Sequence, residues 1–134
     1  MKRVILDTNV FVSAVLGGAI RPVLEYWQTG SYTLIVTNEI LQEYLTVLRR
    51  PKFGLPSTVI ESIVAYVFRK SEFVTPIEQF KVVDQDPDDN KFLDAAFVGE
   101  VDYLVSGDKH LLEIKEFRQI PIISLREFLD QIER

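Results

Sequence analysis

The chain has 134 residues, of which 47% are hydrophobic, and it carries a formal net charge of -5. This length suits one compact domain with a hydrophobic core, and we interpret residues 1–134 as a single domain. The acidic balance excludes a protein that binds nucleic acid through bulk positive charge, because phosphate binding normally needs a basic surface. Cysteine is absent and His110 is the only histidine, which excludes disulfides and argues against a structural zinc site. A reducing, cytoplasmic location fits this composition.

The N-terminal stretch MKRVILDTNVFVSAVL is apolar only over a short distance. Asp7, Asn9 and Ser13 interrupt it before it reaches the length of a signal peptide or of a membrane span. We interpret KRVIL as a strand covered on both faces in a parallel sheet. A helix is expected to follow from about Asn9 and to break near Gly17 and Gly18.

The rest of the chain alternates between helical and strand patterns. Further helices are expected over residues 21–29, 38–50, 57–71, 87–98, 108–117 and 125–133, and strands over 32–36, 73–75, 102–106 and 120–124. Thr37 or Asn38 is the expected N-cap of the helix that Pro51 ends. This alternation predicts an α/β fold with a mainly parallel sheet.

Polar residues follow two of the expected strands directly. Asp7 comes after KRVIL and is followed by Thr8 and Asn9, whereas Ser106 and Asp108 come at the end of the strand at 102–106. In open α/β sheets the ligand crevice lies beyond the carboxyl ends of the strands. These residues are therefore candidates for a functional site. The alternative that both aspartates are only helix N-caps stays open, because each begins a helical pattern.

Five aspartates lie close together in DQDPDDNKFLDAA: Asp84, Asp86, Asp88, Asp89 and Asp94. At about 100° per residue, Asp89 falls on the same helix side as Leu93 and Ala96 and is expected to point inward. Asp94 falls on roughly the opposite side, Asp88 suits a helix cap, and the first two precede the helix in a loop. An inward carboxylate is costly unless a cation or hydrogen-bond donors meet it.

Glu43 lies at the edge of the apolar stripe of its helix, beside Ile40 and Val47, and can face a crevice. Glu39, one turn earlier, is a competing choice. The alternative is that Glu43 is a surface acid, paired for example with Arg50.

Asp7, Glu43, Asp89 and Asp108 together would form an acidic cluster. Mutual repulsion disfavours such a cluster without cations, and Mg²⁺ or Mn²⁺ are the expected partners because hard divalent ions prefer oxygen ligands. A metal site of this kind activates water and stabilises the attacking and leaving oxygens of a phosphodiester.

Four segments carry a resemblance to a known family: VILDTNVFVSAVL, TNEILQEYLTVLRRPKF, DPDDNKFLDAA and DYLVSGDKHLL. They span nearly the whole chain, in the family's order. The chain resembles PIN domains, and specifically the toxin ribonucleases of type II toxin-antitoxin systems (VapC-like). The resemblance implies a three-layer α/β/α domain and a metal-dependent endoribonuclease that cuts RNA with Mg²⁺ or Mn²⁺.

By motif position, the resemblance implies that Asp7, Glu43, Asp89 and Asp108 are the catalytic and metal-binding acids, supported by Asn9 and Ser106. The place of the third acid stays open, because Asp86, Asp88 and Asp94 lie near Asp89. Many relatives have Thr where this chain has Ser106, a change that retains the hydroxyl.

The resemblance also suggests a homodimer, with apolar residues of the helix at 57–68 as its interface, and an antitoxin protein as partner. Candidates for RNA contact are Arg49, Arg50, Lys52 and Lys109, although helix C-terminal charge is an alternative for the two arginines. Two other functions stay open: a catalytically weak PIN-like RNA-binding or scaffold module, and a doubly wound phosphoacceptor protein. Glu43 on a helix fits the second of these poorly.

Overall fold

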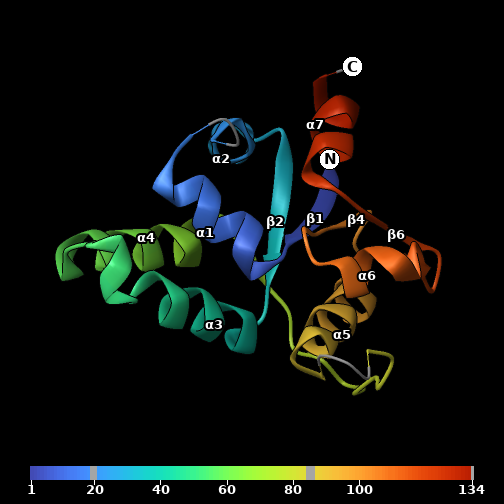
Figure 1. The fold of residues 1–134 in the computed structure, drawn as a ribbon. Helices are drawn as coiled ribbons and strands as arrows, with labels where there is room; N and C mark the ends of the chain where they lie inside the picture. Colours follow the sequence, from blue (N-terminus) through green and yellow to red (C-terminus); the bar gives the residue numbers. More distant parts are fainter. Residues whose placement is uncertain (19–20, 84–86, 134) are drawn as a thin grey trace.

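The computed structural model describes residues 1–18, 21–83 and 87–133 (Figure 1). Asp84 and Asp86 lie outside these ranges. The strands described are β1 (Lys2–Leu6), β2 (Tyr32–Val36), β3 (Glu72–Phe73), β4 (Tyr103–Val105), β5 (Glu116–Phe117) and β6 (Ile120–Ile123). The α-helices described are α1 (Thr8–Leu16), α2 (Pro22–Gln28), α3 (Asn38–Leu48), α4 (Ser57–Lys70), α5 (Asn90–Gly99), α6 (Lys109–Ile114) and α7 (Leu125–Glu133). Two short 3₁₀ turns, η1 (Pro51–Phe53) and η2 (Pro87–Asp89), accompany them.

The strands form one sheet in the order β3-β2-β1-β4-β6-β5. All pairings between neighbours are parallel except that of β5 with β6. Val4 of β1 pairs with Leu34 on one side and with Tyr103 on the other, so β1 is a central strand. The predicted α/β fold with a mainly parallel sheet is confirmed.

Helices cover both faces of this sheet. In Figure 1, α1 to α4 lie on one side of β1 and β2, whereas α5 and α6 lie on the other. Helix α7 packs through Phe128 on the Tyr32 ring and contacts α2 through Glu133, so it covers the same face as α2. Val4, Ile5 and Leu6 of β1 are fully buried, as expected of a strand with helices on both faces. None of the helices in the described part of the chain combines the length and hydrophobicity needed to cross a bilayer.

Helix α5 approaches the sheet closely because its last residue is Gly99. A Cβ atom at Gly99 would lie 2.9 Å from Cγ2 of Ile35 in β2. The missing side chain therefore sets how near α5 lies to the sheet, and with it the position of the residues just before this helix.

Some element boundaries differ from the sequence-based expectations by more than a residue or two, or in the type of element. The helix expected over 108–117 ends at Ile114, and Glu116–Phe117 form β5. The left-handed backbone of Lys115, Arg118 and Gln119, with φ of 67°, 51° and 70°, ends the helix and turns the chain into an antiparallel hairpin. The short strand expected over 73–75 lies at Glu72–Phe73, and the helix expected from Pro87 begins with the turn η2 before α5.

Candidate functional site

A polar cavity of about 330 Å³ lies at the carboxyl ends of the central strands. Its lining includes carboxylates from four separate segments of the chain. The lining residues are Asp7, Thr8, Asn9, Glu43, Thr46, Val47, Arg50, Asp88, Asp89, Phe92 and Asp108. A second cavity of about 410 Å³ between α1, α2 and α4 is lined without any carboxylate, lysine, arginine or histidine. We therefore take the acidic cavity as the candidate site.

Asp7 connects the end of β1 to the start of α1, and it is 4% exposed. Its Oδ1 accepts a hydrogen bond from the Val10 N–H at 2.8 Å, which caps α1. Its Oδ2 accepts from the Ser106 hydroxyl at 2.5 Å and from the Gly107 N–H at 3.0 Å. Burial raises the pKa of the Asp7 carboxyl, while these three donors oppose the rise. Asp7 is thus the N-cap of α1, and it also lines the cavity.

Asp108 is held in a similar way after β4. Its Oδ1 accepts hydrogen bonds from the N–H groups of His110 and Leu111, at 2.7 and 3.3 Å, and so caps α6. The fully buried Ser106 accepts a hydrogen bond from the Asp108 N–H at 2.9 Å and donates its own hydroxyl hydrogen to Asp7. Ser106 therefore links the two strand-end aspartates.

Glu43 reaches the cavity from the middle of α3. Its Oε1 accepts a hydrogen bond from the Thr8 hydroxyl, and its Oε2 forms an ion pair with the Lys91 ammonium group of α5. The half-buried Glu43 is therefore not a solvated surface acid. Its cationic partner is Lys91 rather than Arg50, although Arg50 lines the same cavity. Glu39 is exposed and lines a neighbouring cavity instead.

Asp89 is 9% exposed, in agreement with the inward direction expected from helix geometry. It ends η2 and occupies the N-cap position of α5. The expectation that Asp88 suits this cap is wrong, because the 3₁₀ turn η2 moves the N-cap position to Asp89. Asp88 is exposed and lines both the acidic cavity and the neighbouring one.

Asp94 is half-buried and has a structural partner outside the acidic cavity. Its Oδ1 accepts a hydrogen bond from the Phe80 N–H at 2.7 Å. The Asn90 side chain accepts from the N–H groups of Val82 and Val83, at 3.0 and 2.9 Å. These bonds fasten the extended segment 74–83 along α5. Asp94 thus orders the chain that leads toward the candidate acids.

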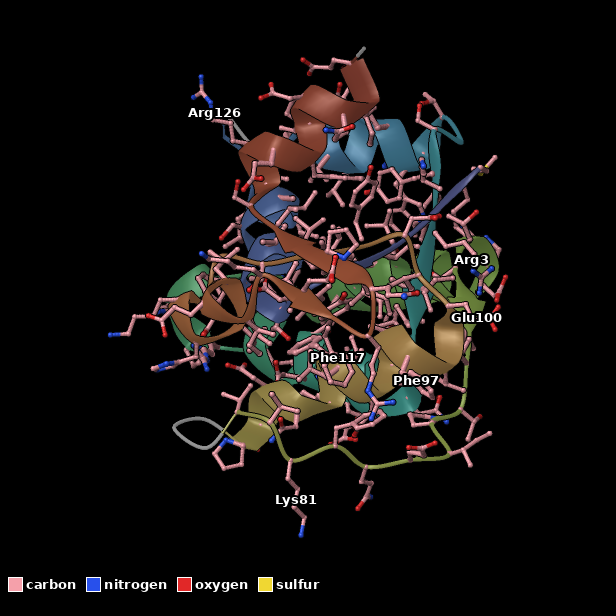
Figure 2. The ribbon with its side chains drawn as sticks, turned by 90° about the vertical axis from the view of Figure 1, so that its right-hand side faces the viewer. Arg3, Lys81, Phe97, Glu100, Phe117 and Arg126 are labelled. Atoms are coloured by element: carbon pink, nitrogen blue, oxygen red, sulfur yellow. The ribbon has the colours of Figure 1, made fainter. Side chains whose placement is uncertain are left out.

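Figure 2 shows this segment from the side, with Lys81 pointing away from the protein. Phe97 and Phe117 lie close together near it. The Phe80 ring contacts both of these rings edge-on, with centroid distances of 5.3 and 5.0 Å. Segment 74–83 is therefore held by both polar and aromatic contacts.

The basic residues considered for RNA contact are distributed unevenly. Arg50 lines the acidic cavity. The neutral Asn9, predicted as a supporting residue, also lines it and is exposed. Arg49 lines a different cavity, while the Lys52 ammonium group lies 5.2 Å from the Phe53 ring. Lys109 is exposed and adjoins Asp108.

Sequence reasoning missed Thr8 as a partner of Glu43 and missed Lys91 altogether. Thr8 follows Asp7 directly, so its nearness to the site was a usable signal. Lys91 carried no such signal, because a lysine in the first turn of a helix is usually solvated.

The carboxylates suit a hard divalent cation by their chemistry, since they offer several oxygen donors around one cavity. Within residues 1–18, 21–83 and 87–133, however, no three acidic or histidine side chains stand together as a formed metal site. Both oxygens of Asp7 accept hydrogen bonds, and Glu43 contacts Lys91. A metal would therefore require rearrangement of side chains, above all around Glu43.

Comparison with known proteins decides the family. A family model described as a PIN domain matches residues 3–110. The chain belongs to the PIN domain family. PIN domains are generally nucleases that use divalent metal ions.

Two similar proteins extend this result. The PIN domain chain is 27% identical over 146 residues to the uncharacterized protein MJ1680 of Methanocaldococcus jannaschii, a match covering 98% of this chain and 92% of that protein. It also resembles the crystal structure of PAE2754 from Pyrobaculum aerophilum, with a TM-score of 0.63 and 12% identity over 98% of this chain and 96% of the other. At that identity, the likeness supports the fold alone.

Proposed function

We propose that this PIN domain is a metal-dependent endoribonuclease whose catalytic and metal-binding residues are Asp7, Glu43, Asp89 and Asp108. The observation that carries the proposal is the convergence of these four carboxylates, from distant positions in the chain, on one cavity of about 330 Å³. Carboxylates gathered in this way repel one another, so the arrangement favours a bound cation. Membership of a generally nucleolytic family adds to this support.

The four acids would hold Mg²⁺ or Mn²⁺, which supplies an activated water and charge neutralisation at the phosphodiester. Asp7 is aligned for this work by Ser106 and Gly107, whose donors hold one of its oxygens. Asp108 is aligned by the first turn of α6, and Asn9 adds a neutral polar group at the rim. The hydroxyl of water would form the new bond to phosphorus, and the sugar oxygen would leave with a proton.

RNA would approach from the open side of this cavity. Arg50 is the basic residue best placed to contact a phosphate beside the acids, since it lines the same cavity. Lys109 adjoins Asp108 and provides a second positive group, whereas Arg49 and Lys52 would contact RNA farther away. With a net charge of -5, affinity would depend on these local groups and on bound metal.

We also propose that the protein is the toxin of a toxin-antitoxin pair and forms a homodimer. The support for dimerisation is that Val59 and Phe68 of α4 are 41% and 58% exposed, more than large apolar side chains usually are. Measurement of the molar mass in solution for the wild type and for Phe68→Ser tests this point. A monomeric wild type would contradict it.

A catalytically weak RNA-binding or scaffold module is the second candidate function. The observation that favours it is the ion pair between Lys91 and Glu43, which neutralises one of the four acids without any metal.

Cleavage of a panel of RNAs and single-stranded DNAs, with Mg²⁺ or Mn²⁺, separates the two candidates. The wild type is compared with Asp7→Asn and Asp89→Asn, and Asp130→Asn on α7 controls for the loss of one negative charge. We expect metal-dependent RNA cleavage that both site variants lose and that the control retains. A folded wild type that binds RNA but cuts none would favour the scaffold module.

A further inference from the structure

Lys91 is a largely buried cation inside an acidic region. Its side chain is 10% exposed, and its ammonium group contacts Glu43 across the interface between α5 and α3. The same ammonium group lies 5.6 Å from the centroid of the Phe92 ring. Burying a lysine is costly unless its charge is paired. The ion pair with Glu43 therefore offsets the cost of burying Lys91.

The partner of Lys91 is one of the proposed metal ligands. The second oxygen of Glu43 accepts a hydrogen bond from Thr8, so both oxygens of this carboxylate are engaged. A divalent ion that used Glu43 would meet the positive charge of Lys91 at short range. Two positive charges at such a short distance repel each other strongly in a partly buried site.

Lys91 also lies beside a second group of carboxylates. It lines a neighbouring cavity of about 370 Å³, together with Glu39, Asp88 and Asp94. A lysine side chain has four rotatable carbon–carbon bonds and a compact charge, and can therefore exchange one carboxylate for another without movement of the backbone.

We propose that Lys91 is a positioning residue that acts as a tethered counter-ion: it holds Glu43 in the metal-free protein and competes with a divalent metal for that carboxylate. On metal binding, Lys91 turns toward the neighbouring acidic cavity and Glu43 becomes a ligand. This inference rests on the proposed function, because it requires that the acidic cavity binds metal. It goes further by assigning a role to a residue outside the four acids.

The first test measures Mn²⁺ affinity without RNA, by calorimetry at fixed ionic strength, for the wild type, Lys91→Gln, Lys91→Arg and Lys81→Gln. We expect Lys91→Gln to bind at least about tenfold more tightly, since a repelling charge is removed. Lys91→Arg keeps the charge and should stay near the wild type. Lys81→Gln is the matched control, because it removes the same charge from a side chain that points into solvent (Figure 2).

The second test uses the wild type alone and so does not depend on the folding of a variant. Amines are labelled with an acetylating reagent, with and without saturating Mn²⁺, and the modified lysines are quantified by mass spectrometry. We expect labelling of Lys91 to rise several-fold with Mn²⁺, while labelling of Lys81 stays constant.

The outcomes separate this inference from the proposed function. If the wild type binds Mn²⁺ but Lys91→Gln binds equally or more weakly, or Lys91 labelling does not rise, the role of Lys91 is wrong and the metal site stands. If neither the wild type nor Lys91→Gln binds Mn²⁺, both proposals fail.

Discussion

The hydroxyl of Tyr44 donates a hydrogen bond of 2.5 Å to the carbonyl oxygen of Leu6, the last residue of β1. Tyr44 is fully buried, and its ring stacks on Phe11 with a centroid distance of 4.2 Å. This contact ties α3 to the chain immediately before Asp7. It thereby brings Glu43, the residue before Tyr44, to the cavity that Asp7 lines.

We expect Tyr44→Phe to lower the free energy of unfolding by about 1–3 kcal/mol, because it leaves a buried carbonyl without its donor while keeping the stacked ring. Urea unfolding measures this change. Tyr26→Phe is the matched control, since it removes an exposed hydroxyl that bonds to Glu133 at 3.1 Å and should have little effect. Equal effects of the two variants would contradict the importance of the contact.

Asp7 should make the stability of the protein depend on pH. Burial raises its folded-state pKa above the ordinary value of 3.8. As pH rises from that value through the folded pKa, the unfolded chain loses the proton first, so this residue lowers the free energy of unfolding over that window. In Asp7→Asn the side chain at position 7 does not titrate, so it adds no such pH dependence to the free energy of unfolding.

We therefore expect the stability of Asp7→Asn, relative to the wild type, to increase from about pH 4 to about pH 7. Urea unfolding of both proteins in the presence of a chelator measures the difference. A difference that stays constant across this range, or that shrinks as pH rises, would show that the folded-state pKa of Asp7 is not raised.

Gly99→Ala tests the close approach of α5 to the sheet. The added methyl group would stand 2.9 Å from Cγ2 of Ile35, so the Ile35 side chain, α5 or β2 must shift. We expect a loss of about 1–3 kcal/mol in the free energy of unfolding, as for overpacked cores. Gly30 is no useful control because its φ is 84°, whereas a methyl group at Gly107 meets no atom within 4 Å. Gly107→Ala should therefore be nearly neutral in the same unfolding measurement.

Much of the fold follows from local sequence patterns. The buried apolar run at residues 4–6 of β1 and the apolar stripe of α3 can be recognised in the sequence, and the phase of the expected helix correctly predicted that Asp89 points inward. The hairpin of β5 with β6 was missed because it depends on left-handed backbone at Arg118 and Gln119. Arginine and glutamine rarely adopt this conformation, so the sequence does not indicate it.

The candidate site is harder to predict than the fold because its details are contacts between distant segments. The pair between Lys91 and Glu43 joins two helices, and nothing in either helix alone selects the partner. Likewise, the half-buried position of Asp94 comes from segment 74–83, which lies over a helix side that would otherwise be solvated. Helix phase placed Asp94 away from the sheet but could not foresee that cover.

Asp94 provides the test of which aspartate near α5 belongs to the site. Its hydrogen bond to the Phe80 N–H is consistent with a structural acceptor. We expect Asp94→Asn, which keeps an acceptor oxygen, to retain stability and RNA cleavage. Asp94→Ala should lose about 1–2 kcal/mol in the free energy of unfolding, because the Phe80 N–H loses its partner.

Asp89→Asn, in contrast to Asp94→Asn, should lose RNA cleavage while its free energy of unfolding changes little. Parallel urea unfolding and RNA cleavage assays of the three variants make the comparison. If Asp94→Asn instead abolishes cleavage while the protein stays folded, Asp94 contributes a carboxylate charge to catalysis, and the assignment of the third acid to Asp89 alone is wrong.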